Sequence, residues 1–159
     1  MSQAADDKAV ERARALVGTT LEGRYRIERV LAMGGMGAVY LGRHLKLKKR
    51  VALKVLHPDV GDQPELVMRF EREALAGAQV SHPNVACATD CGDLDDGMRY
   101  LVMEYVRGET LRAVIDREAP FDATRAVIIA RQIAVGLGEI HARGIVHRDL
   151  KPRNVMLET

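Results

Sequence analysis

The sequence predicts an α+β fold, in which a small antiparallel sheet of five strands with one main helix is followed by a group of helices. From Arg24 the chain shows short alternating runs rich in β-branched and aromatic residues, which is typical of strands. From Gly108 onward the apolar residues recur at helical spacing instead. A chain of 159 residues, of which 47% are apolar and 29% charged, has the length and composition of about one globular domain.

The overall composition narrows the classes of function. The 24 Lys and Arg against 22 Asp and Glu leave a net charge of +2, which gives no reason to expect a nucleic-acid or membrane partner. Acids at Asp6 and Asp7 argue against a signal peptide, and no run approaches the ~18 apolar residues of a membrane span. We therefore expect a cytoplasmic protein. Cys87 and Cys91 have no further metal ligands nearby in the sequence, so we expect them to be buried thiols.

The strand-rich part begins after an Ala- and Arg-rich segment. Residues 1–20 carry only a weak helical stripe and are expected to form a flexible N-terminal extension. Three strands are then predicted near residues 25–31, 38–41 and 51–56. The basic run 46–50 between the last two is interpreted as a solvated hairpin tip rather than a phosphate-binding patch.

The third strand is predicted to run over residues 51–56 with its side chains alternating between two faces. Val51, Leu53 and Val55 would face one way, and Ala52, Lys54 and Leu56 the other.

One helix and two further strands are expected to complete this part of the fold. Asp62, Pro64 and Glu65 form a helix-start signal, because they supply an N-cap, a proline in the first turn and an acid three residues after the cap. This helix is expected to end near residues 81–84. Strands are predicted at about 85–91 and 99–106.

The remaining residues predict two helices. The first runs over about 110–117, beginning at Thr110, and the second over 122–142, capped by Asp122. Gly144 is expected to end the second helix. Its broad apolar face demands a packing partner.

The glycine-rich turn Gly34-Gly35-Met36-Gly37 has several interpretations. A P-loop needs Lys followed by Ser or Thr after the last glycine, which is absent here. A dinucleotide-binding loop leads into a helix, whereas Val39-Tyr40-Leu41 favours another strand. An ordinary glycine hairpin without a ligand remains open, beside a hairpin whose backbone N–H groups cover nucleotide phosphates. Lys54, facing inward on the third strand, would be costly unless paired, and Glu73 on the following helix is the natural partner.

The stretch from His147 to Asn154 carries groups suited to phosphoryl transfer. The Asp149 carboxylate can accept a proton, the Lys151 ammonium can sit beside a developing anion, and the Asn154 amide oxygen can hold a hard metal ion. His147 is interpreted as a packed core histidine.

Together these motifs resemble the eukaryotic-type Ser/Thr protein kinases, particularly their bacterial members. The resemblance covers residues 21 to 157. It rests on the glycine-rich stretch 32–39, the strand 51–54, the helix segment 70–74 and the loop 147–154, in the order that the family shows.

The resemblance implies a protein-kinase-like fold, with residues 21–106 as the small lobe and hinge and 107–159 as a partial large lobe. It also implies ATP and Mg²⁺ as cofactors and Ser or Thr residues of proteins as acceptors. Asp149 and Lys151 would be catalytic, with Lys54 held on the α- and β-phosphates by Glu73, and Asn154 would bind one Mg²⁺. The ATP pocket would be formed by Leu31, Gly34, Gly35, Gly37, Val39, Ala52, Lys54, Met103, Glu104, Val106 and Met156.

Three departures from the family pattern affect these expectations. Ala32 replaces the first glycine of the loop. Arg153 stands where many relatives carry Glu, so a preference for basic substrates does not follow. No Asp-Phe-Gly follows Asn154, so the chain is expected to be truncated after its catalytic loop and weak or inactive as a kinase alone. The alternatives are a product of a truncated reading frame and a non-catalytic kinase-like binding or regulatory module. Such a module would dock on a kinase lobe, or bind a partner through the uncovered 122–142 helix.

Overall fold

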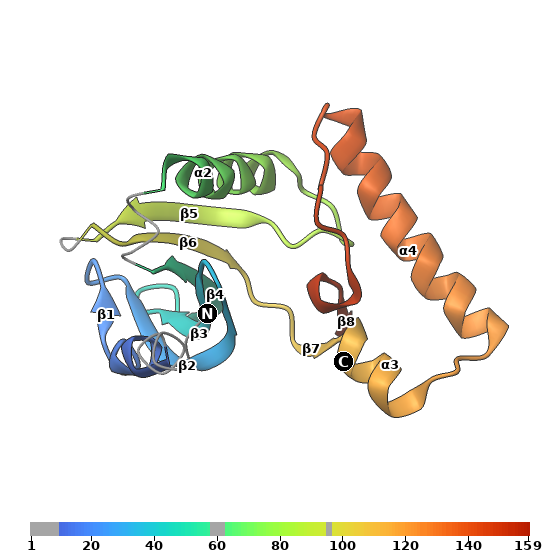
Figure 1. The fold of residues 1–159 in the computed structure, drawn as a ribbon, viewed down its shortest axis with the longest axis horizontal. Coiled ribbons are helices and arrows are strands. Elements are labelled where there is room, and N and C mark those ends of the chain that lie inside the picture. The colour runs from blue at the N-terminus through green and yellow to red at the C-terminus, as the bar shows by residue number, and fades with distance from the viewer. Residues whose placement is uncertain (1–9, 58–62, 95–96) are drawn as a thin grey trace. The chain divides into compact units, whose positions relative to one another are not determined.

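The computed structural model describes residues 10–57, 63–94 and 97–159, apart from the side chains of Arg69, Glu73 and Ala76 (Figure 1). The chain forms two compact units. The first unit contains Met1–Ala78 and Ala88–Tyr105, and the second contains Gln79–Cys87 and Val106–Thr159. The second unit therefore includes residues 79–87, which we had expected to belong with the small lobe.

The first unit is built on one antiparallel sheet, which contains the five predicted strands and one more. The sixth strand is only two residues long, too short for any periodicity to reveal it, and pairs Leu21 with Tyr25. The order in the sheet is β1-β2-β3-β4-β6-β5. The strands are β1 (Thr20–Leu21), β2 (Tyr25–Gly34), β3 (Gly37–His44), β4 (Lys49–Leu56), β5 (Ala88–Asp93) and β6 (Arg99–Glu104).

The helix α2 (Pro64–Gln79) covers one face of this sheet, beside β5 and β6 (Figure 1). Pro64 opens the helix, while Asp62, the predicted N-cap, lies outside the described residues. Leu56, Phe70, Ala74 and Leu101 form the core between sheet and helix. The face alternation predicted for the third strand is confirmed, since Leu56 belongs to this core and other β4 residues to the opposite one.

The opposite face of the sheet holds the larger core. Val51, Leu53 and Val55 of β4 pack there with Ile27 and Ala13 among other residues. Residues 10–15 are helical, and Ala13 is 2% exposed. From residue 10 onward the segment is thus packed on the sheet, which differs from the flexible extension that we expected over 1–20. The weak apolar stripe of this segment is the face that the core uses.

A hydrogen-bond network shows how far the sheet curls. The Tyr25 hydroxyl on β2 donates to Asp90 Oδ2 on β5 at 2.6 Å, although three strands separate β2 from β5 in the sheet. Arg24 contacts the same carboxylate at 2.8 Å and that of Glu22 at 2.6 Å. The Tyr100 hydroxyl also donates to Glu22 at 2.6 Å. These contacts join opposite parts of the sheet around the larger core.

The second unit contains the two predicted helices, α3 (Leu111–Glu118) and α4 (Ala123–Ala142). Asp122 is the N-cap of α4, as predicted, and accepts from the backbone N–H of Arg125. Thr110, which we expected to be the first residue of α3, is its N-cap and accepts from the backbone N–H of Ala113. Gly144 follows α4 with a φ of 71°, a left-handed conformation that glycine adopts without strain. None of the described helices is long and apolar enough to cross a membrane.

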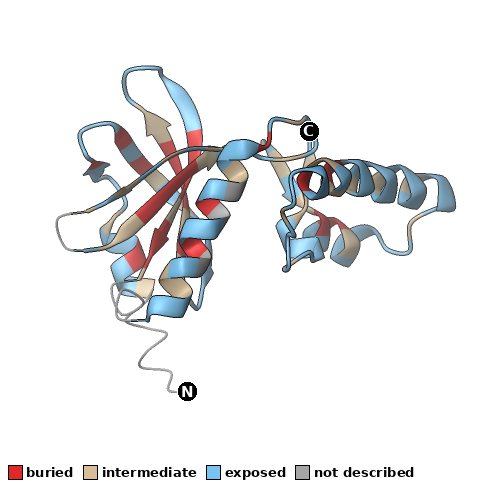
Figure 2. Cartoon of the chain, turned by 90° about the horizontal axis from the view of Figure 1, so that it is seen from above, coloured by how far each residue is buried: buried red, intermediate tan, exposed pale blue. Residues whose placement is uncertain are grey.

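The second unit also holds a two-stranded sheet that we did not predict. It pairs β7 (Gly108–Thr110) with β8 (Met156–Glu158), which follows the short 3₁₀ helix η2 (Pro152–Asn154). Most of α4 is exposed (Figure 2). Val127, Ile128 and Val135 on it are 65%, 53% and 47% exposed.

The cysteine prediction was wrong. Cys87 is only partly buried, and Cys91 is exposed on β5. Because β5 is an edge strand of the sheet, its side chains are covered less than those of β4.

Candidate active site

The strand register gathers part of the predicted ATP pocket on one face of the sheet. Val39 lies directly opposite Lys54, and Ala52 directly opposite Met103. Directly opposed residues share a face, as do residues two apart on one strand, so all four side chains belong to the same face. This is the face that α2 partly covers, and Met103 packs against the core beneath that helix.

The glycine-rich turn is a tight hairpin between β2 and β3. Gly34 pairs with Gly37, so only Gly35 and Met36 lie between the strands. A Cβ on Gly37 would stand 2.1 Å from the Val55 carbonyl oxygen, and the close approach of β4 therefore requires glycine at this position.

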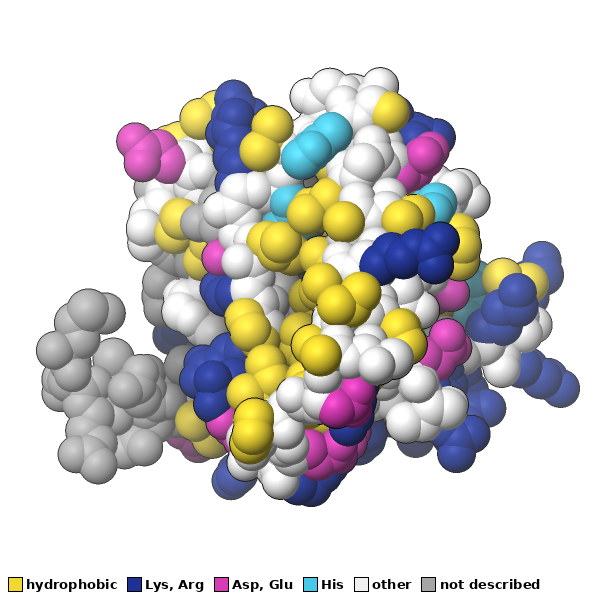
Figure 3. Space-filling view, turned by 90° about the vertical axis from the view of Figure 1, so that its right-hand side faces the viewer, with side chains coloured by type: hydrophobic (Ala, Val, Ile, Leu, Met, Phe, Trp, Pro, Cys, Tyr) yellow, Lys and Arg dark blue, Asp and Glu magenta, His cyan; other side chains and the backbone are white. Residues whose placement is uncertain are grey.

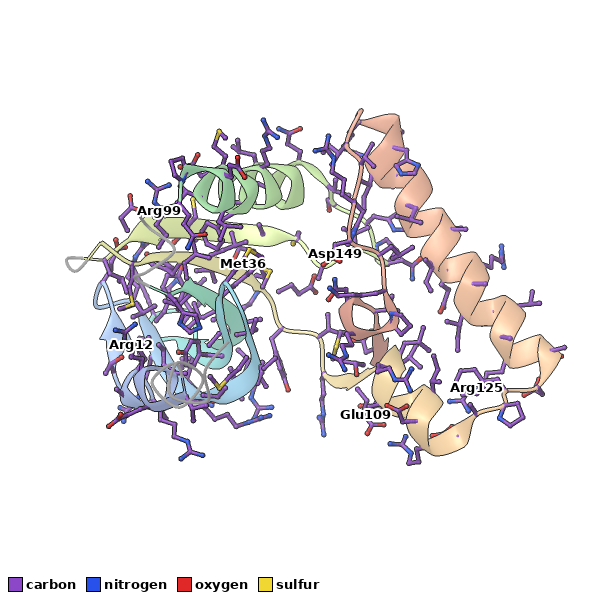
Figure 4. The ribbon with its side chains drawn as sticks, viewed as in Figure 1. Arg12, Met36, Arg99, Glu109, Arg125 and Asp149 are labelled. Atoms are coloured by element: carbon purple, nitrogen blue, oxygen red, sulfur yellow. The ribbon has the colours of Figure 1, made fainter. Side chains whose placement is uncertain are left out.

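Gly35 and Met36 behave differently within this hairpin. A Cβ on Gly35 would meet no described atom within 4 Å, so close packing does not demand a glycine there. An open glycine at a hairpin tip is what a phosphate approaching the backbone needs. Met36 (labelled in Figure 4) packs against the core under α2, and its carbonyl accepts from the His57 N–H at 3.0 Å. Sequence reasoning gave Met36 no role, because an isolated Met between glycines carries no periodic signal.

Lys54 is directed toward α2. Its ammonium lies 5.8 Å from the centre of the Phe70 ring, a cation–π contact. Glu73 follows Phe70 by three residues in the same helix, and residues three apart are neighbours on a helix surface. Lys54 therefore reaches the part of α2 that carries Glu73. The side chain of Glu73 lies outside the described residues, so the Lys54–Glu73 ion pair stays a prediction.

The remaining pocket residues lie at element edges. Leu31 is 36% exposed and falls at the register shift between Val30 and Ala32 on β2. Glu104 is the last residue of β6, whereas Val106 belongs to the second unit. Met156 begins β8 opposite Thr110 in that unit and is 40% exposed. Their assigned roles in binding adenine stay predictions.

Three predicted functional residues converge in the second unit. Lys151 Nζ lies 2.9 Å from both carboxylate oxygens of Asp149 (labelled in Figure 4). Asn154 Nδ2 donates to the Asp149 carbonyl oxygen at 2.8 Å and to its Oδ2 at 3.1 Å. The loop therefore presents a carboxylate held on two sides by an ammonium and an amide.

Local backbone geometry brings these side chains together. Arg148 adopts a φ of 60°, a left-handed conformation that turns the chain just before Asp149. The 3₁₀ helix η2 then returns the chain, and Asn154 N–H donates to the Lys151 carbonyl at 2.8 Å. Pro152 at the start of η2 has the φ that such a turn requires.

The expectation of a packed core histidine was wrong. His147 is exposed, and its Nδ1 accepts from the Asp149 N–H at 3.3 Å. The Asp149 N–H also donates to the His147 carbonyl at 2.8 Å. The His147 ring is therefore hydrogen-bonded within the loop and is not buried in a core.

The donor set of the loop partly suits a magnesium ion. Mg²⁺ prefers oxygen ligands and is commonly held by one or two protein groups together with substrate phosphates. The Asn154 amide donates to Asp149 through its nitrogen, so Oδ1 is the atom that it would offer to a metal. The described residues contain no group of three or more His, Cys, Asp or Glu side chains suited to holding a metal by themselves. The residues fit a metal bound jointly with phosphate oxygens.

Comparisons with known proteins agree with these observations. The protein kinase domain family matches residues 25–159. The chain is 42% identical over 142 residues to the serine/threonine-protein kinase pkn3 of Myxococcus xanthus, covering 89% of this chain and 26% of that protein. It is 40% identical over 143 residues to the serine/threonine-protein kinase PrkC of Bacillus subtilis, covering 90% and 22%.

A solved structure supports the same assignment. The PknI kinase domain of Mycobacterium tuberculosis superposes with a TM-score of 0.75 at 34% identity, covering 89% of this chain and 57% of that one. The chain thus spans about a quarter of the two curated relatives, 26% and 22% of their lengths.

Proposed function

This chain belongs to the protein kinase domain family, among the bacterial eukaryotic-type Ser/Thr kinases, and we propose that its protein transfers the γ-phosphoryl group of ATP to Ser or Thr hydroxyls of other proteins. The convergence of Asp149, Lys151 and Asn154 is the observation that carries the proposal. Phosphoryl transfer is catalysed mainly by positioning and by charge stabilisation, and these three side chains supply both.

In the proposed reaction Asp149 orients the acceptor hydroxyl and takes its proton. The hydroxyl oxygen forms a bond to the γ-phosphorus while the bond from that phosphorus to the bridging oxygen breaks, which leaves ADP. Lys151 stabilises the negative charge of the phosphoryl group during transfer. Asn154 offers its Oδ1 to Mg²⁺, which when bound would neutralise phosphate charge. Lys54 and the Gly35 backbone hold the other phosphates. The adenine base lies against the sheet face that carries Val39, Ala52 and Met103.

Nucleotide binding is tested first, since it does not require turnover. Equilibrium dialysis with labelled ATP and Mg²⁺ should show saturable binding by the 159-residue chain. Lys54→Met should weaken this binding, because the ammonium that faces the phosphates is lost. Lys46→Met, on the β3–β4 turn, is a matched control that should bind as the parent does. Equal binding by parent and Lys54→Met would contradict the assigned pocket.

Phosphoryl transfer is tested with a protein acceptor and labelled ATP. The expectation that these 159 residues alone are weak or inactive stays a prediction, and robust transfer abolished by Asp149→Asn would overturn it. Any measurable rate should fall at least about a hundredfold in Asp149→Asn, because the general base is lost. The matched control is Asp116→Asn on α3, whose carboxylate pairs with Arg112 instead. An unchanged rate in Asp149→Asn would contradict the proposed role.

Because ATP supplies the phosphoryl group, we also propose that the protein acts in the cytoplasm.

The exposed apolar residues of α4 favour a second candidate function, a binding module. Val127, Ile128 and Val135 lie on this helix, and apolar side chains gather on the face that Figure 3 shows. Contiguous apolar surface marks interaction sites. If the module hypothesis holds, light scattering should detect self-association or a complex, and Val127→Ser with Val135→Ser should abolish it. A monomer that retains nucleotide binding would argue for the kinase function alone.

A further inference from the structure

The turn between β3 and β4 concentrates positive charge and exposed leucine. We call residues 44–50, His-Leu-Lys-Leu-Lys-Lys-Arg, the basic hairpin tip. It contains three lysines and one arginine but no acid. Leu45 and Leu47 are 41% and 61% exposed, in alternation with the lysines. The net charge of the whole chain, +2, does not reveal this local excess of positive charge.

Hydrogen bonds hold the basic hairpin tip in a defined turn. The Lys48 N–H donates to the His44 carbonyl at 2.8 Å, and Lys48 has a φ of 55°. The Leu47 N–H donates to His44 Nδ1 at 3.4 Å. The Leu45 N–H donates at 2.8 Å to the carbonyl of Arg24, which lies in the turn just before β2. The exposure of the two leucines is therefore a feature of the folded turn.

A row of arginines continues the positive charge across the sheet. Arg26 of β2, Arg43 of β3 and Arg50 of β4 lie directly opposite one another in neighbouring strands, so their side chains share a face. Like charges in such positions repel one another. Within the described part of the chain the one ion pair of this row joins Arg43 to Glu28 at 2.8 Å. An external anion lying across the row would relieve the repulsion.

We propose that the basic hairpin tip and the arginine row form a docking surface for the anionic headgroups of a lipid bilayer. Lysine and arginine near such a surface are attracted to the headgroups, while exposed leucines enter the boundary between headgroups and acyl chains. The alternation of leucine and lysine over 45–49 matches both parts of that interface. A nucleic acid would use the cations but offers no apolar phase for Leu45 and Leu47, and the tip has no Phe, Tyr or Trp for base stacking.

Vesicle co-sedimentation of the 159-residue chain tests the proposal. The chain should sediment with phosphatidylcholine vesicles that contain roughly 30% phosphatidylglycerol, and should stay in solution with phosphatidylcholine alone. Lys46→Glu with Lys49→Glu should weaken binding by about thirtyfold or more, since each cation near an anionic surface contributes about a factor of five. Leu45→Ser with Leu47→Ser should also weaken binding while leaving the charge unchanged.

Two matched controls keep the test specific to the tip. Arg107→Glu with Arg131→Glu changes the net charge by the same amount outside the tip, and Val127→Ser with Val135→Ser removes exposed apolar residues from α4. Both controls should bind vesicles as the parent does, and circular dichroism should show that every variant is folded. No sedimentation of the parent, or equal losses in tip and control variants, would overturn the proposal. A loss in the lysine variant but not in the leucine variant would also overturn it, because an acidic protein or nucleic acid would then fit better.

Discussion

The ammonium of Lys151 lies 2.9 Å from each carboxylate oxygen of Asp149, so it bridges the group that we propose as the general base. A cation held symmetrically on this carboxylate fixes its orientation. It also places positive charge where the incoming phosphoryl group would develop negative charge. One side chain thus serves both the proton acceptor and the transferred group.

Removal of the Lys151 ammonium should reduce transfer without abolishing nucleotide binding. Lys151→Met is expected to lower any phosphoryl-transfer rate by about a hundredfold, in the range found when one charge-stabilising group is removed. Lys151→Arg, which keeps the charge, should recover part of the loss. Arg131→Met on α4 is a control for the loss of an exposed cation. Equal rates for Lys151→Met and Arg131→Met would show that the contact with Asp149 has no catalytic use.

Substitutions at Gly35 and Gly37 of the hairpin should have separate effects on ligand binding and on stability. Gly37→Ala is expected to destabilise the first unit by about 1–3 kcal/mol, because the new Cβ would press on a backbone oxygen that cannot move freely. Gly35→Ala meets no described atom and should change stability by less than about 0.5 kcal/mol. Urea unfolding monitored by circular dichroism measures both.

The same pair then tests the phosphate role of the hairpin. Gly35→Ala should weaken ATP binding if the backbone at the tip lies against phosphates, even though the fold is unchanged. Normal binding by a stable Gly35→Ala protein would instead favour an ordinary glycine hairpin. Stability of Gly37→Ala equal to that of the parent would mean that β3 and β4 can separate more than their pairing suggests.

The sequence predicted the fold well where periodicity and end signals are strong. The alternation in β4, the N-cap Asp122 and the glycine after α4 are local patterns, and each was confirmed. The two-residue β1 and the three-residue β7 and β8 were missed, because such strands are defined by their partners rather than by their own residues. The burial of Ala13 depends in the same way on a distant sheet face.

For the candidate site, spacing alone identified the loop residues but not their contacts. The convergence of Lys151 and Asn154 on Asp149 requires the left-handed Arg148 and the η2 turn, which no periodicity reveals. The error at His147 has a related cause. We expected a packed core histidine, whereas the exposed ring accepts a hydrogen bond from the Asp149 N–H within the loop. Interactions across the chain, such as that of Lys54 with Phe70, need the fold itself.

The N-cap of α4 should contribute measurably to the stability of the second unit. Asp122 accepts from the Arg125 N–H at 3.0 Å, and replacing such a cap by alanine costs about 1 kcal/mol. Asp122→Ala should therefore lower the midpoint of urea unfolding, whereas Asp122→Asn, which retains a capping oxygen, should remain near the parent. Identical midpoints for alanine and asparagine would show that the cap is not used.

Alkaline pH should weaken the first unit through Tyr25. Burial, assisted by its hydrogen bond to Asp90, raises the pKa of Tyr25 from its ordinary value of 10.0 to about 12. The folded protein thus retains the phenolic proton over a pH range in which the unfolded chain loses it. The contribution of Tyr25 to the free energy of unfolding is therefore complete below about pH 10. It is lost as the pH rises from there toward about 12. Burial also raises the pKa of Tyr100, so both hydroxyls act in the same direction.

Urea unfolding at about pH 7 and about pH 11 measures this dependence, and Tyr25→Phe identifies its source. The phenylalanine variant lacks the hydrogen bond to Asp90 and should be less stable than the parent at neutral pH. It should lose less stability on going to alkaline pH, because one titrating hydroxyl has been removed. Tyr105→Phe is the matched control, since its ring lies outside this network, and it should keep the parent's pH dependence. An alkaline loss of equal size in the parent and Tyr25→Phe would show that the closure of the sheet through Tyr25 and Asp90 does not govern its stability at high pH.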